Sequence, residues 1–355
     1  MKITAASDHT AVLTVNGLAA GHEYEYTILI GGQPVELPYP AVFQTAPEDG
    51  EPEKFSFAFG GGAGYVTKHE HMWDVIARSQ PDALMLLGDN MYSDDPQSRS
   101  AQRFCYYRRQ SPLPFRKLVA RTAVYSIWDD HDFGTNDCSG GPDVDSPDWK
   151  LPVWNTYRNN WVNPGYGGGE SRPGCWYAFR VGDVRFIMLD GRYYRHRPGK
   201  TMLGPDQKAW LKKQLTASES TFTVIASPVP WEYRTKGQSK DTWNGFQEER
   251  KEIFDFLAEN KIGGVLLISA DRHRSDAWKI DRPNGYSLYE FNSSRLTNTH
   301  VHGTMKEAIF SYNKKQSFGL VEFDLTAADP TVSYTVINID GEKMHTLQLK
   351  RSQLK

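Results

Sequence analysis

One short stretch of the sequence is unusually rich in side chains that can do chemistry. Residues 123–137 read AVYSIWDDHDFGTND, so apolar and small residues lead into a cluster of polar ones. The candidate ligands in it are Asp129, Asp130, His131, Asp132, Asn136 and Asp137. Carboxylates crowded into one pocket repel one another unless cations neutralise them. The pattern therefore indicates a candidate metal site at the end of a strand.

Two other segments end in residues of the same kind. PDALMLLGDNMY supplies Asp89 and Tyr92, and GGVLLISADRHRS supplies Asp271 and His273. Taken singly, each segment also fits an ordinary structural explanation, namely a capped turn, an exposed turn or a solvated acidic loop. Ligands gather at the carboxyl ends of strands in α/β proteins. Three separate strand ends that all carry ligands therefore favour one shared metal site.

The ligand types restrict the metal and suggest a reaction. Carboxylate oxygens suit Mg²⁺, Ca²⁺ or Mn²⁺, and imidazole or phenolate ligands also admit Zn²⁺ or iron. A carboxylate that bridges two metals about 3.5–4 Å apart makes a two-metal hydrolytic site. Such metals lower the pKa of a bound water and neutralise charge on a phosphoryl group. A neighbouring imidazole can protonate the leaving oxygen.

The elements that must position these ligands alternate along the chain. From residue 55, short apolar segments such as FSFAFG and ALMLL alternate with amphipathic ones such as LGPDQKAWLKKQL, and residues beyond about 286 read mostly as strands. This order predicts an α/β domain with a mixed pair of sheets over residues 55–355. Residues 1–47, including TAVLTVNG, read as β-strands, and residues 48–54 read as a linker.

Composition excludes several other kinds of protein. The formal net charge of the 355 residues is −2, which gives no electrostatic case for binding nucleic acid or an anionic membrane. No apolar run approaches the ~20 residues of a membrane span, and the N-terminus lacks the apolar core of a signal peptide. The spacing of Cys105, Cys138 and Cys175 matches no metal site. Three free thiols are expected, with a Cys138–Cys175 bridge as the alternative in an oxidising compartment.

The order of these motifs resembles the PhoD-like alkaline phosphatases, a branch of the calcineurin-like metallophosphoesterase superfamily. The segments that carry the resemblance are PDALMLLGDNMY, YSIWDDHDFGTND, FIMLDGRYYR, FTVIASPVPW and GGVLLISADRHRS. The resemblance implies a four-layer αββα sandwich behind a short N-terminal β segment of fibronectin-III type. It also implies hydrolysis of phosphomonoesters or phosphodiesters, and a periplasmic or secreted location.

The resemblance also assigns roles to individual residues. Asp89 is expected to bridge the metals, with Tyr92 as a phenolate ligand. The further metal ligands that it implies are Asp129, Asp130, Asn136, Asp271 and His273. His131 is expected to assist the leaving group or stabilise the transition state. Arg192 is expected to contact phosphate, with burial in an ion pair with Asp190 as the alternative.

One position departs from the family pattern. The first strand of the family ends in a cysteine whose thiolate binds iron, and this chain has Gly62 there. Glycine has no side chain that can bind a metal. Two divalent ions (Ca, Mg, Mn, Zn or Fe) are expected from the ligand set as a whole. Because the cysteine ligand is missing, the first of the two sites is expected to be weaker, differently filled or vacant, and a ferric ion is in doubt. Ala270 also replaces a glycine of the last motif.

Three functions are compatible with this pattern. The first is a metal-dependent hydrolase of phosphoric esters, in which water or hydroxide held by the metals attacks phosphorus and His131 assists the leaving group. The second is a hydrolase of a phosphotriester, carboxylic ester or lactone on the same scaffold. The third is a non-catalytic relative that binds phosphate. The substrate of the first is a small-molecule or polymeric phosphoester, and the sequence predicts no oligomeric state.

Overall fold

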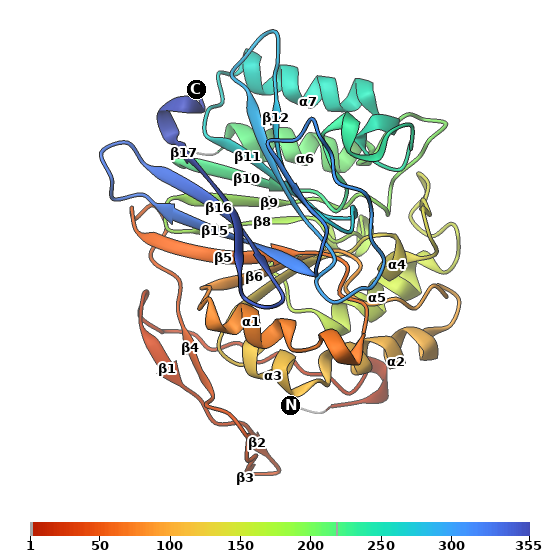
Figure 1. Ribbon diagram of the computed structural model, residues 1–355. Coiled ribbons are helices and arrows are strands. Elements are labelled where there is room, and N and C mark those ends of the chain that lie inside the picture. The colour runs from red at the N-terminus through yellow and green to blue at the C-terminus, as the bar shows by residue number, and fades with distance from the viewer. Residues whose placement is uncertain (1–2, 218) are drawn as a thin grey trace.

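Two β-sheets packed face to face form the centre of the protein, and helices cover their outer faces (Figure 1). The computed structural model describes residues 3–217 and 219–355. The layers run helices, sheet, sheet, helices, which is the αββα arrangement that the family resemblance implied. In the described residues, no helix is long and apolar enough to cross a lipid bilayer.

The first sheet has seven strands among the described residues, in the order β14-β12-β13-β11-β10-β9-β8. Its central strands β9, β10, β11 and β13 run parallel to one another. The strands span Tyr177–Val181 (β8), Val184–Met188 (β9), Phe222–Ala226 (β10), Val265–Ser269 (β11), Ser275–Ile280 (β12), Leu288–Ser293 (β13) and Phe310–Tyr312 (β14). β10 and β11 are buried along their whole length, as expected for parallel strands that are covered on both faces.

The second sheet has six strands in the described part of the chain, in the order β17-β16-β15-β5-β6-β7. β5, β6 and β7 are parallel, and β15, β16 and β17 continue the sheet in antiparallel pairs. The strands span Lys54–Gly60 (β5), Ala83–Leu87 (β6), Ala123–Ile127 (β7), Ser317–Asp324 (β15), Thr331–Asn338 (β16) and Lys343–Lys350 (β17). The carboxyl ends of the two sheets meet where Gly61 forms a parallel bridge with Ser294.

Helices pack on both outer faces through apolar side chains. On one side lie Gly204–Thr216 (α6) and Gln247–Glu259 (α7); on the other lie Met72–Arg78 (α1), Arg99–Gln110 (α2), Leu113–Val119 (α3) and Lys150–Asn160 (α5) (Figure 1). The short helices are Asp130–Phe133 (α4), Ala5–Ser7 (η1), Thr67–His69 (η2), Gly169–Ser171 (η3), Tyr233–Lys236 (η4), Trp243–Gly245 (η5) and Arg351–Gln353 (η6). Leu211 of α6 and Ile253 of α7 join Ile225 and Leu267 of the first sheet in one buried cluster.

Aromatic rings fill the space between the two sheets. Phe57 of β5 meets Phe186 of β9 edge-on with ring centroids 5.4 Å apart, and Phe291 of β13 stacks on Tyr334 of β16 at 4.5 Å. Such pairs each contribute about 0.5–1.5 kcal/mol beyond the apolar area that they bury. Much of the high aromatic content of the chain therefore serves the core that holds the strand ends in place.

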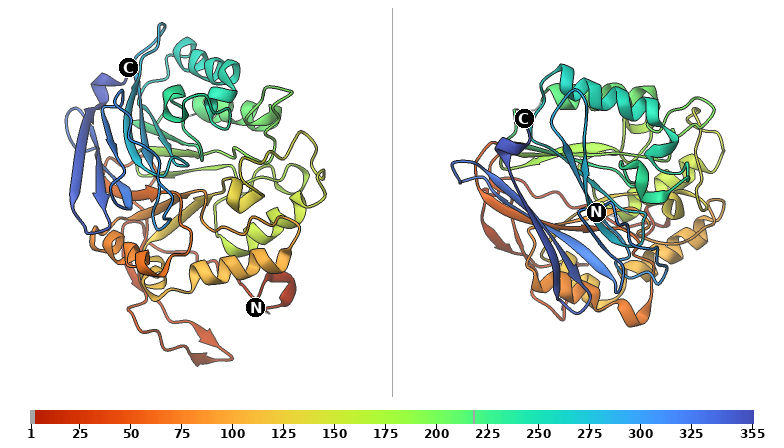
Figure 2. Two further views of the ribbon diagram at one scale, coloured as in Figure 1. Left: turned by 45° about the vertical axis from the view of Figure 1, so that its right-hand side comes forward. Right: turned by 45° about the horizontal axis from the view of Figure 1, so that its top comes forward.

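The N-terminal segment contains less regular structure than its sequence suggests. Glu23–Glu25 (β1) pairs with Val42–Gln44 (β4), and Leu29–Ile30 (β2) pairs with Gln33–Pro34 (β3), a hairpin that projects from the body in Figure 2. The strand expected at residues 10–17 is wrong, because that stretch pairs with no strand of the described residues and its valine and leucine side chains are exposed. Without a second layer to cover them, alternating apolar residues gain nothing from an extended pairing.

The three cysteines are all free, which confirms the expectation of three unpaired thiols. Cys105 and Cys175 are buried, and Cys138 is partly buried. Burial raises the pKa of the Cys138 thiol to about 12. The alternative of a Cys138–Cys175 bridge is therefore wrong for this structure, and each thiol behaves as a small apolar side chain.

Candidate metal centre

The ends of β6 and β7 come so close together that a glycine is needed between them. Gly88 has φ +104°, and a Cβ at this position would lie 2.5 Å from the Cβ of Asp129. Asp89 follows with φ +53°, a conformation that costs energy in residues other than glycine. The close approach brings Asp89 beside the acidic cluster that follows β7.

Asp132 locks these two loops together and is not itself exposed to the pocket. Its Oδ1 accepts hydrogen bonds from the backbone N–H groups of Asn90 (2.9 Å) and Met91 (3.0 Å). Its Oδ2 accepts from the backbone N–H of Asp129 (2.9 Å). One carboxylate of the DDHD run thus has a positioning role, because leaving three buried N–H groups without acceptors would be costly.

A pocket of about 350 Å³ opens at these strand ends. It brings together seven residues that the sequence predicted, namely Asp89, Tyr92, Asp130, His131, Asn136, Asp271 and His273. Two predicted site residues, Asp129 and Arg192, do not line it. A larger cavity of about 560 Å³ lies against the N-terminal segment, and no predicted ligand lines that cavity.

Asp89 is a buried carboxylate that lacks a counter-charge. Its Oδ2 accepts a hydrogen bond from Tyr92 Oη at 2.9 Å, whereas Oδ1 is buried and meets no donor among the described residues. Burial, together with the negative charges of Asp130 and Asp129, raises the pKa of Asp89 well above its ordinary range. A cation placed beside Asp89 would give Oδ1 a partner and would favour the ionised form of the carboxylate.

Asp130 and His131 supply further ligand atoms next to Asp89. One atom from each of the three side chains lies within 4.8 Å of the others, which is close enough for a shared ion. The His131 ring lies 4.5 Å from the Tyr92 ring, and its Nδ1 is 2.5 Å from Oδ1 of Asp94. Because the carboxylate of Asp94 can only accept, Nδ1 carries the hydrogen and Nε2 is the free nitrogen.

Arg192 is buried beneath the pocket, and its guanidinium is fully engaged by carboxylates. Nε donates to Asp129 Oδ1 at 2.5 Å, and Nη1 and Nη2 donate to the two oxygens of Asp241 at 3.0 and 2.9 Å. The side chain is not exposed to solvent. This placement argues against the predicted phosphate contact. The alternative pairing with Asp190 also fails, because only the backbone N–H of Arg192 reaches that carboxylate.

Asp129 consequently differs from its neighbour Asp130. Its Oδ1 pairs with Arg192, and its Oδ2 is buried without a donor among the described residues. Burial raises the pKa of Asp129 well above its ordinary range, although Arg192 opposes the shift. Asp129 therefore points toward the buried Arg192, whereas its neighbour Asp130 lines the pocket.

Asp271 and His273 reach the pocket from the end of β11, both with positive φ (+64° and +46°). Burial lowers the pKa of His273 to about 3, so the imidazole is neutral, which is the form that binds metals. Its Nδ1 is buried and has no partner within the described residues. Burial raises the pKa of Asp271, but nearby Lys236 and Arg272 outweigh it and hold that pKa below its ordinary value.

Several pocket residues were missed by the sequence reasoning. They are Lys236, Asn298, His300 and His302, whereas Asp137, which also lines the pocket, was among the candidate ligands that follow β7. The two additional histidines approach each other, with 3.0 Å between their Nε2 atoms, and Nδ1 of His302 donates to the carbonyl of Arg272 at 2.9 Å. Their His-x-His spacing in TNTHVHG was a usable signal. Asp241 gave no signal, because it lies in an irregular loop far from any strand end.

Gly62 lies in the loop that joins β5 to the rest of the site. Its φ is +68°, and its carbonyl accepts from the N–H groups of Thr297 (3.2 Å) and Asn298 (3.1 Å). A Cβ there would lie 3.0 Å from the backbone nitrogen of Arg295. At Gly61, a Cβ would lie 2.6 Å from that of Ala270, so the loop abuts the residue before Asp271. No side chain of this glycine loop can ligate a metal.

Comparison with known proteins identifies the family. The family model for PhoD-like phosphatases matches residues 57–348, which is most of the chain. Alkaline phosphatase D of Bacillus subtilis (strain 168) is 22% identical, and the match covers 83% of this chain. The chain spans only 58% of the length of that relative.

Solved structures show the same fold. A structure of PhoD matches with a TM-score of 0.78 at 16% identity, over 96% of this chain and 78% of that one. Purple acid phosphatase PPD1 of yellow lupin (Lupinus luteus) matches with a TM-score of 0.68 at 12% identity, over 94% and 60%. GAP50, an anchor in the inner membrane complex of Plasmodium, matches with a TM-score of 0.53 at 14% identity, over 84% and 89%. By the extent of its family match, the chain belongs to the PhoD-like phosphatases.

Proposed function

We propose that this chain hydrolyses phosphoric esters, either monoesters or diesters, with the help of divalent metal in the pocket. The observation that carries the proposal is the uncompensated charge of Asp89. Its Oδ1 is buried without a donor in the described part of the chain, and candidate ligand atoms of Asp130 and His131 lie within 4.8 Å. A cation would keep this buried carboxylate ionised, and family membership favours phosphoester chemistry at it.

The donor set fits hard divalent ions. Asp89, Asp130, Tyr92 and Asn136 would hold one ion, and Asp271 and His273 face the position of a second. Asp129 can take part only through Oδ2, because Arg192 holds its other oxygen. When bound, the metal supplies Lewis acidity toward a phosphoryl oxygen and an activated water as the nucleophile.

In this proposal His131 moves the proton that the leaving group needs. Asp94 accepts the Nδ1 hydrogen and fixes the ring, and Tyr92 packs beside it. In the doubly protonated ring, Nδ1 keeps its hydrogen on Asp94, and Nε2 gives its proton to the leaving oxygen and leaves a neutral imidazole. Such a step contributes about 10²–10⁴-fold in other enzymes. Arg192 acts differently in this proposal: it holds Asp129 and Asp241 in place and does not touch the substrate.

Two alternatives stay open to test. The same pocket suits another ester, such as a phosphotriester, carboxylic ester or lactone, and the fold also occurs in GAP50, which is described as an anchor. Fold alone therefore does not decide the function. The periplasmic or secreted location implied by the resemblance likewise stays a prediction.

A substrate panel separates these possibilities. Chelator-treated protein is assayed with and without added Mn²⁺, Ca²⁺ or Zn²⁺ on bis(4-nitrophenyl) phosphate, 4-nitrophenyl phosphate and 4-nitrophenyl acetate. We expect hydrolysis of one or both phosphates only with metal, and little hydrolysis of the acetate. Faster hydrolysis of the acetate would favour the other-ester alternative. Equal, negligible rates with and without metal on all substrates would favour the non-catalytic one.

A further inference from the structure

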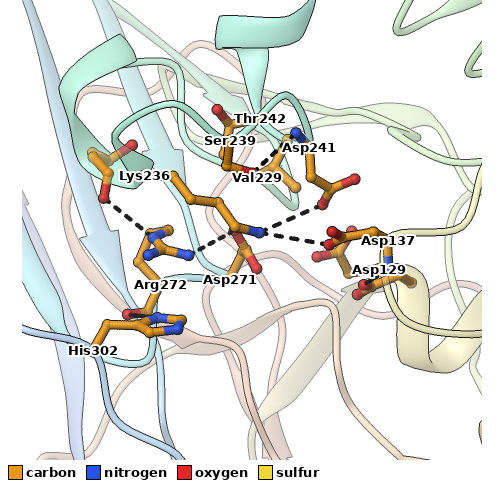
Figure 3. Close-up of polar contacts among 12 residues, drawn as sticks. Asp129, Asp137, Val229, Lys236, Ser239, Asp241, Thr242, Asp271, Arg272 and His302 are labelled. Carbon is orange, nitrogen blue, oxygen red and sulfur yellow. Dashed lines mark hydrogen bonds and ion pairs between the residues drawn. The ribbon is translucent and has the colours of Figure 1, made fainter. Parts of the chain in front are cut away.

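Lys236 places an ammonium group inside the acidic pocket. It ends η4, in the long connection between β10 and α7, and only 17% of its side chain is exposed. Its Nζ lies 3.4 Å from Asp271 Oδ2 and 3.7 Å from both Asp137 Oδ1 and Asp241 Oδ2. Figure 3 shows the lysine reaching from its loop toward these carboxylates, which belong to three different loops. Because the amine contacts carboxylates from three loops, Lys236 is an integral part of the site.

Two of the three carboxylates around Lys236, Asp241 and Asp271, also have other counter-charges. Both oxygens of Asp241 accept from Arg192, and Arg195 donates to one of them at 2.5 Å. Asp271 has a second cation in Arg272, whose Nη1 lies 3.7 Å from Oδ2. A divalent ion at Asp271 would therefore sit among fixed positive charges that repel it. By contrast, Asp89 forms no ion pair with any basic side chain among the described residues.

A second feature of the same place is independent of the lysine. The glycine loop abuts Ala270, immediately before Asp271, since a Cβ at Gly61 would meet that of Ala270 at 2.6 Å. This loop has no side chain that could complete a coordination shell beside Asp271. The nearby imidazoles of His300 and His302 bond to each other. The Asp271 position thus has His273 as an available ligand but already holds cations, whereas the Asp89 position has no cation among the described residues.

We propose that the Lys236 ammonium takes the place of a second metal ion beside Asp271, so that the chain holds one divalent ion, at Asp89 and Asp130. The inference rests on the proposed function and narrows it from two ions to one. In this arrangement Lys236 contributes one positive charge that Asp137, Asp241 and Asp271 share. Its hydrogens also face the pocket, where phosphoryl oxygens of the substrate would lie.

The test is the number of divalent ions bound per chain. Chelator-treated protein is titrated with Mn²⁺, and free Mn²⁺ is followed by electron paramagnetic resonance. We expect one tightly bound ion in the natural chain and in Lys236→Arg, and a second, weaker ion in Lys236→Met. Lys240→Met removes an exposed lysine of the same segment and should leave the count at one. Thermal melting of each variant checks folding.

A further variant keeps the test decisive if Lys236→Met does not fold. Asp271→Asn should retain the single ion with its affinity within about threefold, because the ion lies at Asp89. Two ions in the natural chain, no second ion in folded Lys236→Met, or loss of the ion in Asp271→Asn would each overturn the lysine proposal. These results leave the proposed function standing, whereas a natural chain that binds no ion would contradict both.

Discussion

Replacing Asp89 by asparagine is expected to lower turnover of a phosphoric ester by about 10³-fold or more. The amide keeps the size of the side chain and removes the buried charge that calls for a cation. Loss of a metal that stabilises the transition state by several kcal/mol corresponds to a factor of this order. The measurement is kcat/KM on bis(4-nitrophenyl) phosphate, with bound metal determined on the same samples.

A matched substitution isolates the effect of position. Asp49 is an exposed aspartate in the segment before β5, far along the chain from any pocket residue. Asp49→Asn should keep full rate and metal content. The asparagine at position 89 should also preserve or raise the melting temperature, because it relieves repulsion from Asp130 and Asp129 in metal-free protein. Full activity in Asp89→Asn would show that this carboxylate is not needed for metal binding or turnover.

Replacing His131 by asparagine is expected to lower the rate in a way that depends on the leaving group. A general acid contributes about 10²–10⁴-fold where the leaving oxygen needs a proton. We therefore expect a loss in that range for alkyl phosphate esters and a much smaller loss for 4-nitrophenyl esters, whose leaving group departs as the anion. The measurement is kcat for a series of esters with leaving groups of increasing pKa.

Two outcomes of this series distinguish the roles open to His131. A steeper dependence on leaving-group pKa in His131→Asn supports a proton donor. An equal loss for every ester, accompanied by weaker metal binding, would show that the imidazole is a ligand instead, as its proximity to Asp89 and Asp130 allows. Asp94→Asn should give a smaller loss, about 10-fold, because Asp94 acts only through the orientation of the ring.

The site residues that directly follow strands were predicted from the sequence. Asp89, Asp130 and Asp271 follow apolar strands, and parallel strands place their carboxyl ends together, so their convergence in one pocket could be foreseen. The alternation of strands and helices predicted an α/β domain with a mixed pair of sheets, and the family resemblance added the four-layer arrangement. Each of these inferences relied on local pattern, which is visible in a single chain.

The residues that sequence misplaced depend on contacts between distant loops. Arg192 was expected to contact phosphate, but Asp241, which is 49 positions away, binds both terminal nitrogens of its guanidinium. Lys236, at the end of the short helix η4, and His302, in an irregular loop, likewise reach the pocket from long connections whose paths no periodicity encodes. Residues 10–17 show a different kind of error. Their alternating pattern predicted a strand, but the segment pairs with no described sheet, and its valines and leucine are exposed.

The most direct test of the account is a titration that follows bound metal and turnover in one sample. Chelator-treated protein receives increasing Mn²⁺, and the rate on bis(4-nitrophenyl) phosphate is recorded at each degree of occupancy. The account predicts that the rate rises from near zero in proportion to the first bound ion and that Asp89→Asn neither binds that ion tightly nor gains the rate. Full turnover in metal-free protein, or a rate unrelated to occupancy, would contradict it.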